Sequence, residues 1–141
     1  YEIDFLFGSV KKSRIYHNYF PNKIWFTFNI YPSHSVSFFI RRKAQKKLGY
    51  YNTSFKYSAD RDLVYRIIRK KLKGTSTKKN EVLGTFSLSG ISSRVSYFEK
   101  ITEEFRIRLS NKENLLKTVI IMTITVIYHF LKKTKNRIFK K

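Results

Sequence analysis

Two carboxylates at the expected start of a helix constrain this chain most strongly. Asp60 and Asp62 are the only acidic residues between Asp4 and Glu81. They precede residues 63–72, whose apolar spacing is typical of an amphipathic helix. A helix N-terminus leaves N–H groups without partners and favours negative charge. The pair therefore either stabilises the start of this helix or takes part in chemistry, and the residues by themselves allow both interpretations.

Hydrophobic periodicity predicts a chain of mixed strands and helices, of the α/β or α+β class. The strands are expected at residues 1–7, 24–31, 36–40 and 85–89. The helices are expected at residues 41–48, at residues 58–72 with Ser58 or Asp60 as cap, from Ser96, and from Ser110. Ser96 and Ser110 are each followed three residues later by Glu, which is the spacing of a capping box. Residues 74–80 are predicted to be a polar, basic loop.

The composition limits the classes of function. The net charge of +21 on 141 residues indicates an anionic partner, which could be nucleic acid, a nucleotide or phosphate ligand, or an anionic membrane surface. A coding sequence rich in A and T would explain part of this charge, since Lys, Asn, Ile, Phe and Tyr are all abundant. The absence of Cys excludes disulfides, thiol catalysis and Cys-based zinc sites. The three histidines, His17, His34 and His129, have no metal-motif spacing.

A set of motifs in residues 32–66 (PSHSVSFFIRRKAQKKLGYYNTSFKYSADRDLVYR) resembles a known family. A His precedes a strand that ends in Phe-x-Arg-Arg. A helix, a Gly-aromatic turn and an Ala-Asp-x-Asp-Leu motif follow, with an Arg four residues beyond the second Asp. This order resembles the acceptor-side half of family 2 glycosyltransferases, which have the GT-A fold. The matching positions are His34, Phe39, Arg41, Arg42, Gly49, Tyr50, Ala59, Asp60, Asp62, Leu63 and Arg66.

The resemblance extends over residues 3–93. Residues 3–10 are similar to the strand that follows the family's metal-binding Asp-x-Asp motif, and residues 86–93 to a later strand and Gly-Ser turn. The chain departs from the family at Ala59, where many members have Glu and a related subgroup has Ala. It also lacks the nucleotide-sugar half with its Asp-x-Asp motif. The resemblance therefore implies the C-terminal half of an enzyme, which we expect to be inactive on its own.

The implied fold is α/β, a partial GT-A-like mixed sheet with flanking helices and a C-terminal helical extension. Residues 1–94 would form the acceptor-side part of the domain, and residues 95–141 the C-terminal helices with a basic tail. The implied function is an inverting transfer of a sugar from a nucleotide-sugar donor to a glycan or lipid-linked hydroxyl acceptor, as in polysaccharide biosynthesis. The complete enzyme would use a divalent metal, Mn or Mg, whose ligands lie mostly outside this chain. The expected location is cytoplasmic, including the membrane surface.

The resemblance also assigns roles to individual residues. A single displacement needs a base beside the attacking hydroxyl, and Asp60 is the expected base. Asp62 and Arg66 are spaced as an i, i+4 pair, and we expect them to orient the loop. His34 would lie near the donor phosphates or the acceptor. No metal ligand is assigned within the chain.

Two rivals stay open beside the enzyme. The first is a non-enzymatic basic module that binds nucleic acid or an anionic membrane through Lys and Arg at residues 66–79 and 132–141. The chain carries no RNP, KH, zinc-finger or helix-turn-helix signature, so nucleic acid is not the expected partner. The second rival is a degenerate half that no longer catalyses.

The C-terminal segment gives a separate signal. Residues 119–131 are apolar except for two Thr, a Tyr and a His, and six of the last ten residues are Lys or Arg. The apolar run is shorter than the roughly 20 residues that span a bilayer. An apolar helix followed by a basic tail suits an anchor at the surface of an anionic membrane. A core helix with a solvated tail explains the same pattern, and both interpretations stay open.

Overall fold

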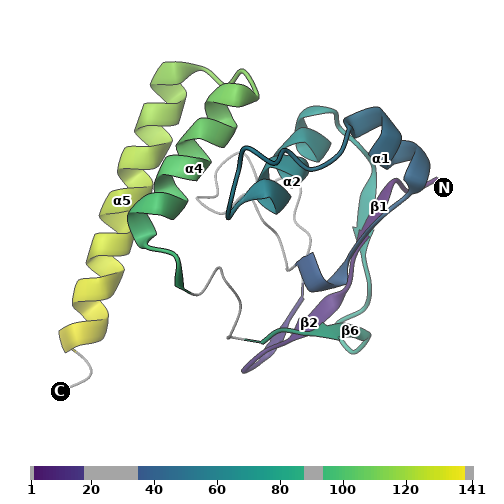
Figure 1. Cartoon of the computed structure of the whole chain (residues 1–141). Helices are drawn as coiled ribbons and strands as arrows, with labels where there is room; N and C mark the ends of the chain where they lie inside the picture. The colour runs from purple at the N-terminus through teal and green to yellow at the C-terminus, as the bar shows by residue number, and fades with distance from the viewer. Residues whose placement is uncertain (1, 18–34, 88–93, 139–141) are drawn as a thin grey trace.

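The computed structural model describes residues 2–17, 35–87 and 94–138 (Figure 1). Strands and helices are mixed along the chain, as the hydrophobic periodicity predicts. The elements are β1 (Phe5–Phe7), β2 (Ser9–Lys11), β3 (Ile15–Tyr16), the 3₁₀ turn η2 (Ser35–Ser37), β4 (Phe38–Ile40), α1 (Arg42–Leu48), α2 (Ala59–Arg69), β5 (Gly74–Ser76), β6 (Val82–Thr85), α4 (Tyr97–Ser110) and α5 (Leu115–Ile138). The alternating segment at residues 24–31 and the histidine His34 lie outside the described residues.

Within the described residues, the strands form two small mixed sheets. One has the order β4-β1-β5 and the other the order β3-β2-β6. In the first, β1 pairs antiparallel with β4 and parallel with β5, so that Phe5 lies opposite both Ile40 and Gly74. In the second, β2 pairs antiparallel with β3 and parallel with β6. The expected α/β character is therefore present, in two sheets of three strands each.

One predicted loop is wrong. Residues 74–80 were expected to be a polar loop, but Gly74–Ser76 forms β5 and pairs with the buried strand β1. A Cβ at Gly74 would lie 2.0 Å from the Phe5 ring, so the glycine lets that ring approach the neighbouring strand. Of the strand expected at residues 85–89, Thr85 ends β6 (Val82–Thr85), residues 86 and 87 are not in a strand, and residues 88 and 89 lie outside the described residues.

The helices begin and end largely where the sequence places them. α1 follows Arg41 and ends at Gly49, which has φ 85°, a left-handed conformation that glycine adopts without strain. α4 begins with the expected capping box, because Ser96 and Glu99 bond each other's backbone N–H groups. The predicted cap at Ser110 is wrong, since α4 continues to that residue. Asn114 caps α5 instead, through a 3.0 Å bond from the Lys117 N–H to its side chain.

A single cluster of buried side chains joins the first sheet to the helices. Phe5 and Phe7 from β1 meet Leu63 and Ile67 from α2, and Ile107 from α4 completes the cluster. All five are at most 2% exposed. The expected apolar face of α2 is therefore the buried face. The predicted division of the chain at residue 94 stays a prediction, although α4 does share this core with α2.

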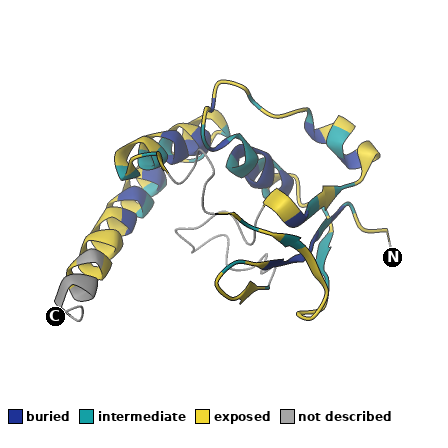
Figure 2. Ribbon diagram, turned by 60° about the horizontal axis from the view of Figure 1, so that its bottom comes forward, coloured by how far each residue is buried: buried dark blue, intermediate teal, exposed yellow. Residues whose placement is uncertain are grey.

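α4 and α5 form a helical pair beside α2, and α5 runs away from the rest of the molecule (Figures 1 and 2). The Tyr97 hydroxyl of α4 donates to the Thr125 carbonyl over 3.3 Å, and its ring lies 4.8 Å from that of His129. Within the described residues, one segment, Leu115–Lys132, is long and apolar enough to cross a membrane by length and composition, with a mean hydropathy of 1.6. Only 17% of that segment is buried in the chain.

Candidate functional site

Asp60 and Asp62 both lie in the first turn of α2, but their surroundings differ. Asp62 is 2% exposed and belongs to the interior. Asp60 is half-buried, and its Oδ1 accepts the Arg61 N–H over 2.8 Å. The helix is preceded by Ser58, whose side chain makes no capping bond. Asp60 therefore satisfies one of the N–H groups at the start of the helix, which is the structural role that the sequence allowed.

The ion pair predicted between Asp62 and Arg66 is confirmed. Arg66 Nε lies 2.9 Å from Asp62 Oδ2. The other carboxylate oxygen accepts a 2.8 Å bond from the side-chain amide of Asn111, the residue just after α4. Both Asp62 oxygens are thus used, one by a residue of α2 and the other by the residue that ends α4. A buried carboxylate needs such partners, because an unpaired charge in the interior is strongly unfavourable.

Arg66 also fixes the turn that follows α1. Its Nη1 donates to the Leu48 carbonyl over 2.7 Å and its Nη2 donates to the Tyr50 carbonyl over 2.8 Å. These are the last residue of α1 and the residue just beyond Gly49. Arg66 therefore ties the Gly-aromatic turn to α2, the helix whose first turn contains Asp60.

Two acidic residues of α4 bind residues on either side of Asp60 in the sequence. Glu103 is 6% exposed, and its carboxylate accepts the N–H groups of Lys56 and Tyr57 over 2.7 and 3.0 Å. Glu104 is 4% exposed and pairs with Arg61 at 3.0 Å and with Arg108 at 3.1 Å. Sequence reasoning did not assign these residues. The signal that could have identified them is that two adjacent acidic residues lie on one helix of a strongly basic chain.

An aromatic side chain lies close enough to Asp60 to respond to its charge. Burial first, and then the negative charge of Asp60, raises the pKa of the Tyr51 hydroxyl. Tyr51 is 50% exposed and its neighbour Tyr50 is 79% exposed. The site thus combines a half-buried carboxylate with two accessible rings. A carboxylate can accept a proton from a bound hydroxyl, and exposed rings provide flat apolar surface for a ligand.

Two other residues of the sequence motif are His34 and Arg41. His34 lies outside the described residues, so its expected role stays a prediction. Arg41 forms an exposed 3.1 Å ion pair with Glu2 near the N-terminus. Among the residues that the structure describes, no three His, Cys, Asp or Glu side chains are grouped so that they could hold a metal ion. The assignment of no metal ligand within the chain and the expected Mn or Mg ion of the complete enzyme both stay predictions.

A second polar cluster lies at the far end of α2. The Tyr65 hydroxyl donates to Glu113, and Lys117 pairs with the same carboxylate at 3.0 Å. These side chains line a cavity of about 340 Å³ together with basic residues that include Arg69 and Arg108. Burial and the bond to Glu113 raise the pKa of the Tyr65 hydroxyl. The cluster ties α2 to the junction of α4 and α5, and sequence reasoning missed it.

Comparisons of the chain with protein-family models, with curated proteins and with solved structures found no match. Function is therefore argued from the residues and the geometry of the site.

Proposed function

We propose that this chain is the acceptor-side part of an inverting, nucleotide-sugar-dependent glycosyltransferase with a GT-A-like fold, similar to family 2. Asp60 is the base that takes the proton of the acceptor hydroxyl. The motif order in residues 32–66 supports the proposal. The position of Asp60 carries it: this carboxylate is half-buried at the start of α2, and burial together with its charge raises the pKa of the partly exposed Tyr51 hydroxyl, whereas Asp62 is 2% exposed.

The proposed chemistry is a single displacement. The acceptor oxygen forms a bond to the anomeric carbon while the bond from that carbon to the nucleoside diphosphate breaks and leaves its electrons on the phosphate. The acceptor proton passes to the Asp60 carboxylate, and the sugar is transferred with inversion. Asp62 and Arg66 keep the turn and the base in place and take no part in the bond changes. The divalent metal expected in the complete enzyme would offset the charge on the leaving diphosphate, through ligands that lie mostly outside this chain.

The test compares Asp60→Asn with Asp62→Asn in the longest natural polypeptide that contains this chain. Asp60→Asn should lower sugar transfer at least ~10²-fold, the usual scale for loss of a general base. Its folding should survive, because the amide oxygen can still accept the Arg61 N–H. Asp62→Asn should instead lower the free energy of unfolding by about 2–3 kcal/mol, since it removes the charged partner of Arg66.

The measurements are transfer rates from a panel of UDP-, GDP- and dTDP-sugars and thermal unfolding of each variant. The expected result is a crossed pattern, in which one variant loses activity and the other loses stability. Near-normal transfer by Asp60→Asn would overturn the assignment of the base. Failure of the unsubstituted protein to transfer or hydrolyse any of the donors would overturn the enzyme itself.

A further inference from the structure

The exposed surface of α5 is apolar, and its buried surface carries hydroxyl groups. Thr118 and Thr125 are buried, and Thr125 bonds the Ile121 carbonyl over 2.8 Å. Many large apolar side chains of α5 are exposed, and six of them, 46–70% exposed, lie along one side of the helix. We call these six the apolar arc: Leu116, Val119, Ile120, Ile127, Phe130 and Leu131. At 3.6 residues per turn they fall within an arc of about 120°, and the exposed Leu115, Ile124, Val126 and Tyr128 extend the apolar face to about 220°. This polarity is the reverse of that of a soluble helix, whose exposed face is polar.

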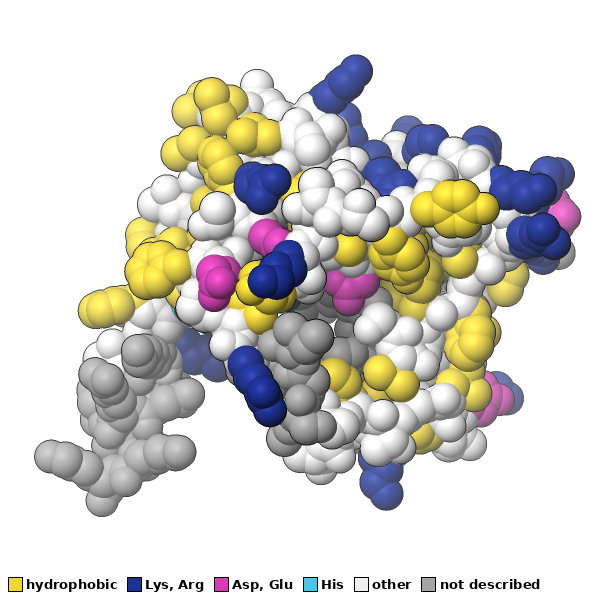
Figure 3. All heavy atoms as spheres, viewed as in Figure 1, with side chains coloured by type: hydrophobic (Ala, Val, Ile, Leu, Met, Phe, Trp, Pro, Cys, Tyr) yellow, Lys and Arg dark blue, Asp and Glu magenta, His cyan; other side chains and the backbone are white. Residues whose placement is uncertain are grey.

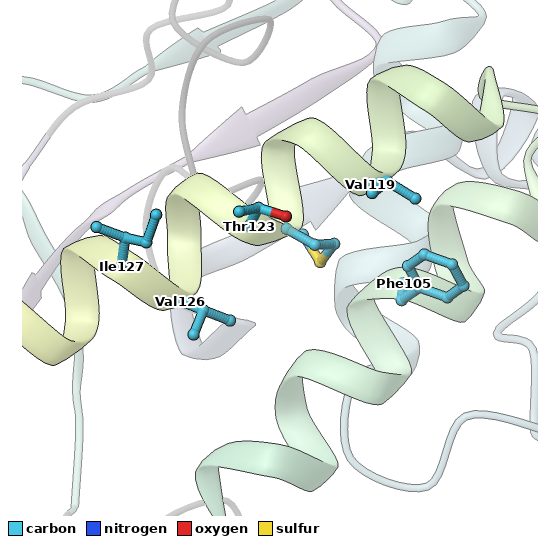
Figure 4. A pocket seen from close by; sticks show the side chains of 6 residues that line it. Phe105, Val119, Thr123, Val126 and Ile127 are labelled. Atoms are coloured by element: carbon cyan, nitrogen blue, oxygen red, sulfur yellow. The ribbon is translucent and has the colours of Figure 1, made fainter.

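An open apolar groove borders the arc. It has a volume of about 320 Å³, and Phe105 of α4 lines it together with Val119, Met122, Thr123, Val126 and Ile127 of α5 (Figure 4). Apart from the Thr123 hydroxyl, the lining side chains are apolar. A groove of this chemistry fits a hydrocarbon chain rather than a polar ligand.

Basic residues continue directly from the arc. Lys132, Lys133, Lys135 and Arg137 follow within two turns of the same helix, and two more lysines end the sequence. Clusters of Lys and Arg next to an apolar segment bind anionic lipid headgroups. In Figure 3, hydrophobic side chains gather over α4 and α5, whereas many Lys and Arg side chains gather over α1. Other exposed apolar side chains, such as Phe39 and Tyr50, lie elsewhere on the chain, and those of α5 differ from them in being followed directly by basic residues.

We propose that α5 docks on an anionic lipid bilayer, lying in the plane of its surface. The apolar arc enters the boundary between headgroups and acyl chains, an acyl chain fills the groove, and the basic residues from Lys132 onward bind the headgroups. The proposal does not rest on the proposed sugar transfer, because it uses none of the residues around Asp60.

The packing of α4 favours an in-plane helix over a spanning one. α4 runs along α5 as far as His129, which Tyr97 contacts. It carries the exposed charged residues Glu99 and Arg106. If α5 crossed the bilayer, these charges would be carried to the depth of the hydrocarbon, where ionised side chains are strongly unfavourable. With α5 in the plane of the surface, α4 can remain on the aqueous side.

Binding is tested with the 141-residue chain and two kinds of vesicle, one of phosphatidylcholine alone and one with about one third phosphatidylserine. The chain should sediment with the anionic vesicles and bind the neutral ones at least about tenfold more weakly. A rise from low to high salt should remove most of that difference, because salt screens the basic residues and leaves the apolar term.

Matched substitutions identify the surface. The variant I120Q/I127Q removes two side chains from the apolar arc and should weaken binding at least about tenfold. The control V36Q/F39Q removes two side chains of similar exposure, 45% and 53%, from η2 and β4 and should bind normally. All four positions are exposed, and circular dichroism would verify that each variant folds.

The depth of α5 distinguishes the two orientations. The chain has no Cys, so a cysteine introduced at Leu116, Ile120 or Ile127 carries the only spin label. An in-plane helix places all three labels at similar depth. A spanning helix separates the first and last by about 16 Å along the bilayer normal. Such a gradient of depth would overturn the in-plane proposal.

Two further results would overturn it as well. The first is failure to bind anionic vesicles at low salt. The second is loss of binding in V36Q/F39Q but not in I120Q/I127Q. Tight, salt-dependent binding of a duplex oligonucleotide with no vesicle binding would assign the basic tail to nucleic acid instead.

Discussion

Glu113 is a residue whose charge state links the pH of the solution to the stability of the fold. Burial raises its pKa, but the bonds from Tyr65 and Lys117 outweigh burial and hold the pKa below the ordinary value of 4.5. The folded state therefore favours the carboxylate. Its contribution to stability is present above about pH 4.5 and is lost as the pH falls through the lower pKa of the folded state.

Glu113→Gln tests this linkage. At neutral pH the variant should be about 1 kcal/mol less stable, the usual scale for one hydrogen bond. Below about pH 4.5 its free energy of unfolding should fall less steeply than that of the unsubstituted chain. Urea unfolding at several pH values measures both. Identical acid slopes for the two proteins would contradict the role given to Glu113.

Tyr65→Phe is the companion variant. The pKa of the Tyr65 hydroxyl is raised, so its stabilising effect is present below about pH 10 and is lost at higher pH. The variant should therefore lose stability less steeply above pH 10 than the unsubstituted chain does. Below about pH 4.5, the free energy of unfolding of Tyr65→Phe should also fall less steeply than that of the unsubstituted chain, because Glu113 loses one of its two hydrogen-bond donors.

Sequence and structure agree at the residue scale wherever the spacing is local. The Asp62–Arg66 pair follows from positions four apart on one helix, and the Ser96–Glu99 cap follows from three. Asn111, which completes the partners of Asp62, lies 49 residues away. Its part depends on how α4 packs against α2, and nothing in its own sequence neighbourhood indicates that contact.

At the scale of elements, two helices end at a left-handed residue that the sequence does not predict. α2 and α4 are each followed by a lysine in the left-handed conformation, Lys71 with φ 52° and Lys112 with φ 57°. In both, the next N–H bonds back to the helix, from Leu72 to Ile67 and from Glu113 to Arg108, as in a Schellman motif. Glycine is the usual residue at this left-handed position. Neither helix has one, so the sequence located the ends of α2 and α4 only approximately.

Lys112→Gly should stabilise the chain. Glycine adopts a positive φ without the steric cost that Lys bears, and this gain exceeds the entropy that glycine loses. The expected increase in the free energy of unfolding is about 0.5 kcal/mol. Lys100→Gly, at the fourth residue of α4, is the control and should lower it by about 1 kcal/mol. Denaturant titrations of the two variants and the unsubstituted chain measure these changes. Destabilisation by Lys112→Gly would contradict the steric cost assigned to the positive φ of Lys112.

The strand β5 shows where sequence reasoning about elements fails. Residues 74–76 are Gly-Thr-Ser, which by composition belong to a loop. They form a strand because β1 provides a parallel partner, with Leu6 opposite Thr75. Pairing over almost seventy residues is a tertiary effect, and it outweighs local propensity. The small side chains are also what allows the Phe5 ring to lie across Gly74.

On the scale of the whole molecule, packing decreases from α2 to the end of α5. Leu63 and Ile67 of α2 are 1% exposed, whereas Phe130 and Leu131 of α5 are 69% and 62% exposed. Buried apolar contacts oppose local opening, and segments that have few of them open at low free energy. The molecule should therefore combine a stable centre with a helix whose far end is weakly held in water.

Hydrogen exchange in the absence of lipid measures this gradient. Amides of α2 should exchange only through global unfolding, and those of residues 126–132 should exchange at least ~10²-fold faster, because opening there breaks few contacts. The experiment is repeated at two protein concentrations, since association of the apolar arcs of two chains would slow exchange at the higher one only. Equal protection of α2 and residues 126–132 in dilute solution would contradict the gradient. It would also mean that the apolar side chains of α5 are covered within the chain, which would weaken the case for a bilayer as their partner.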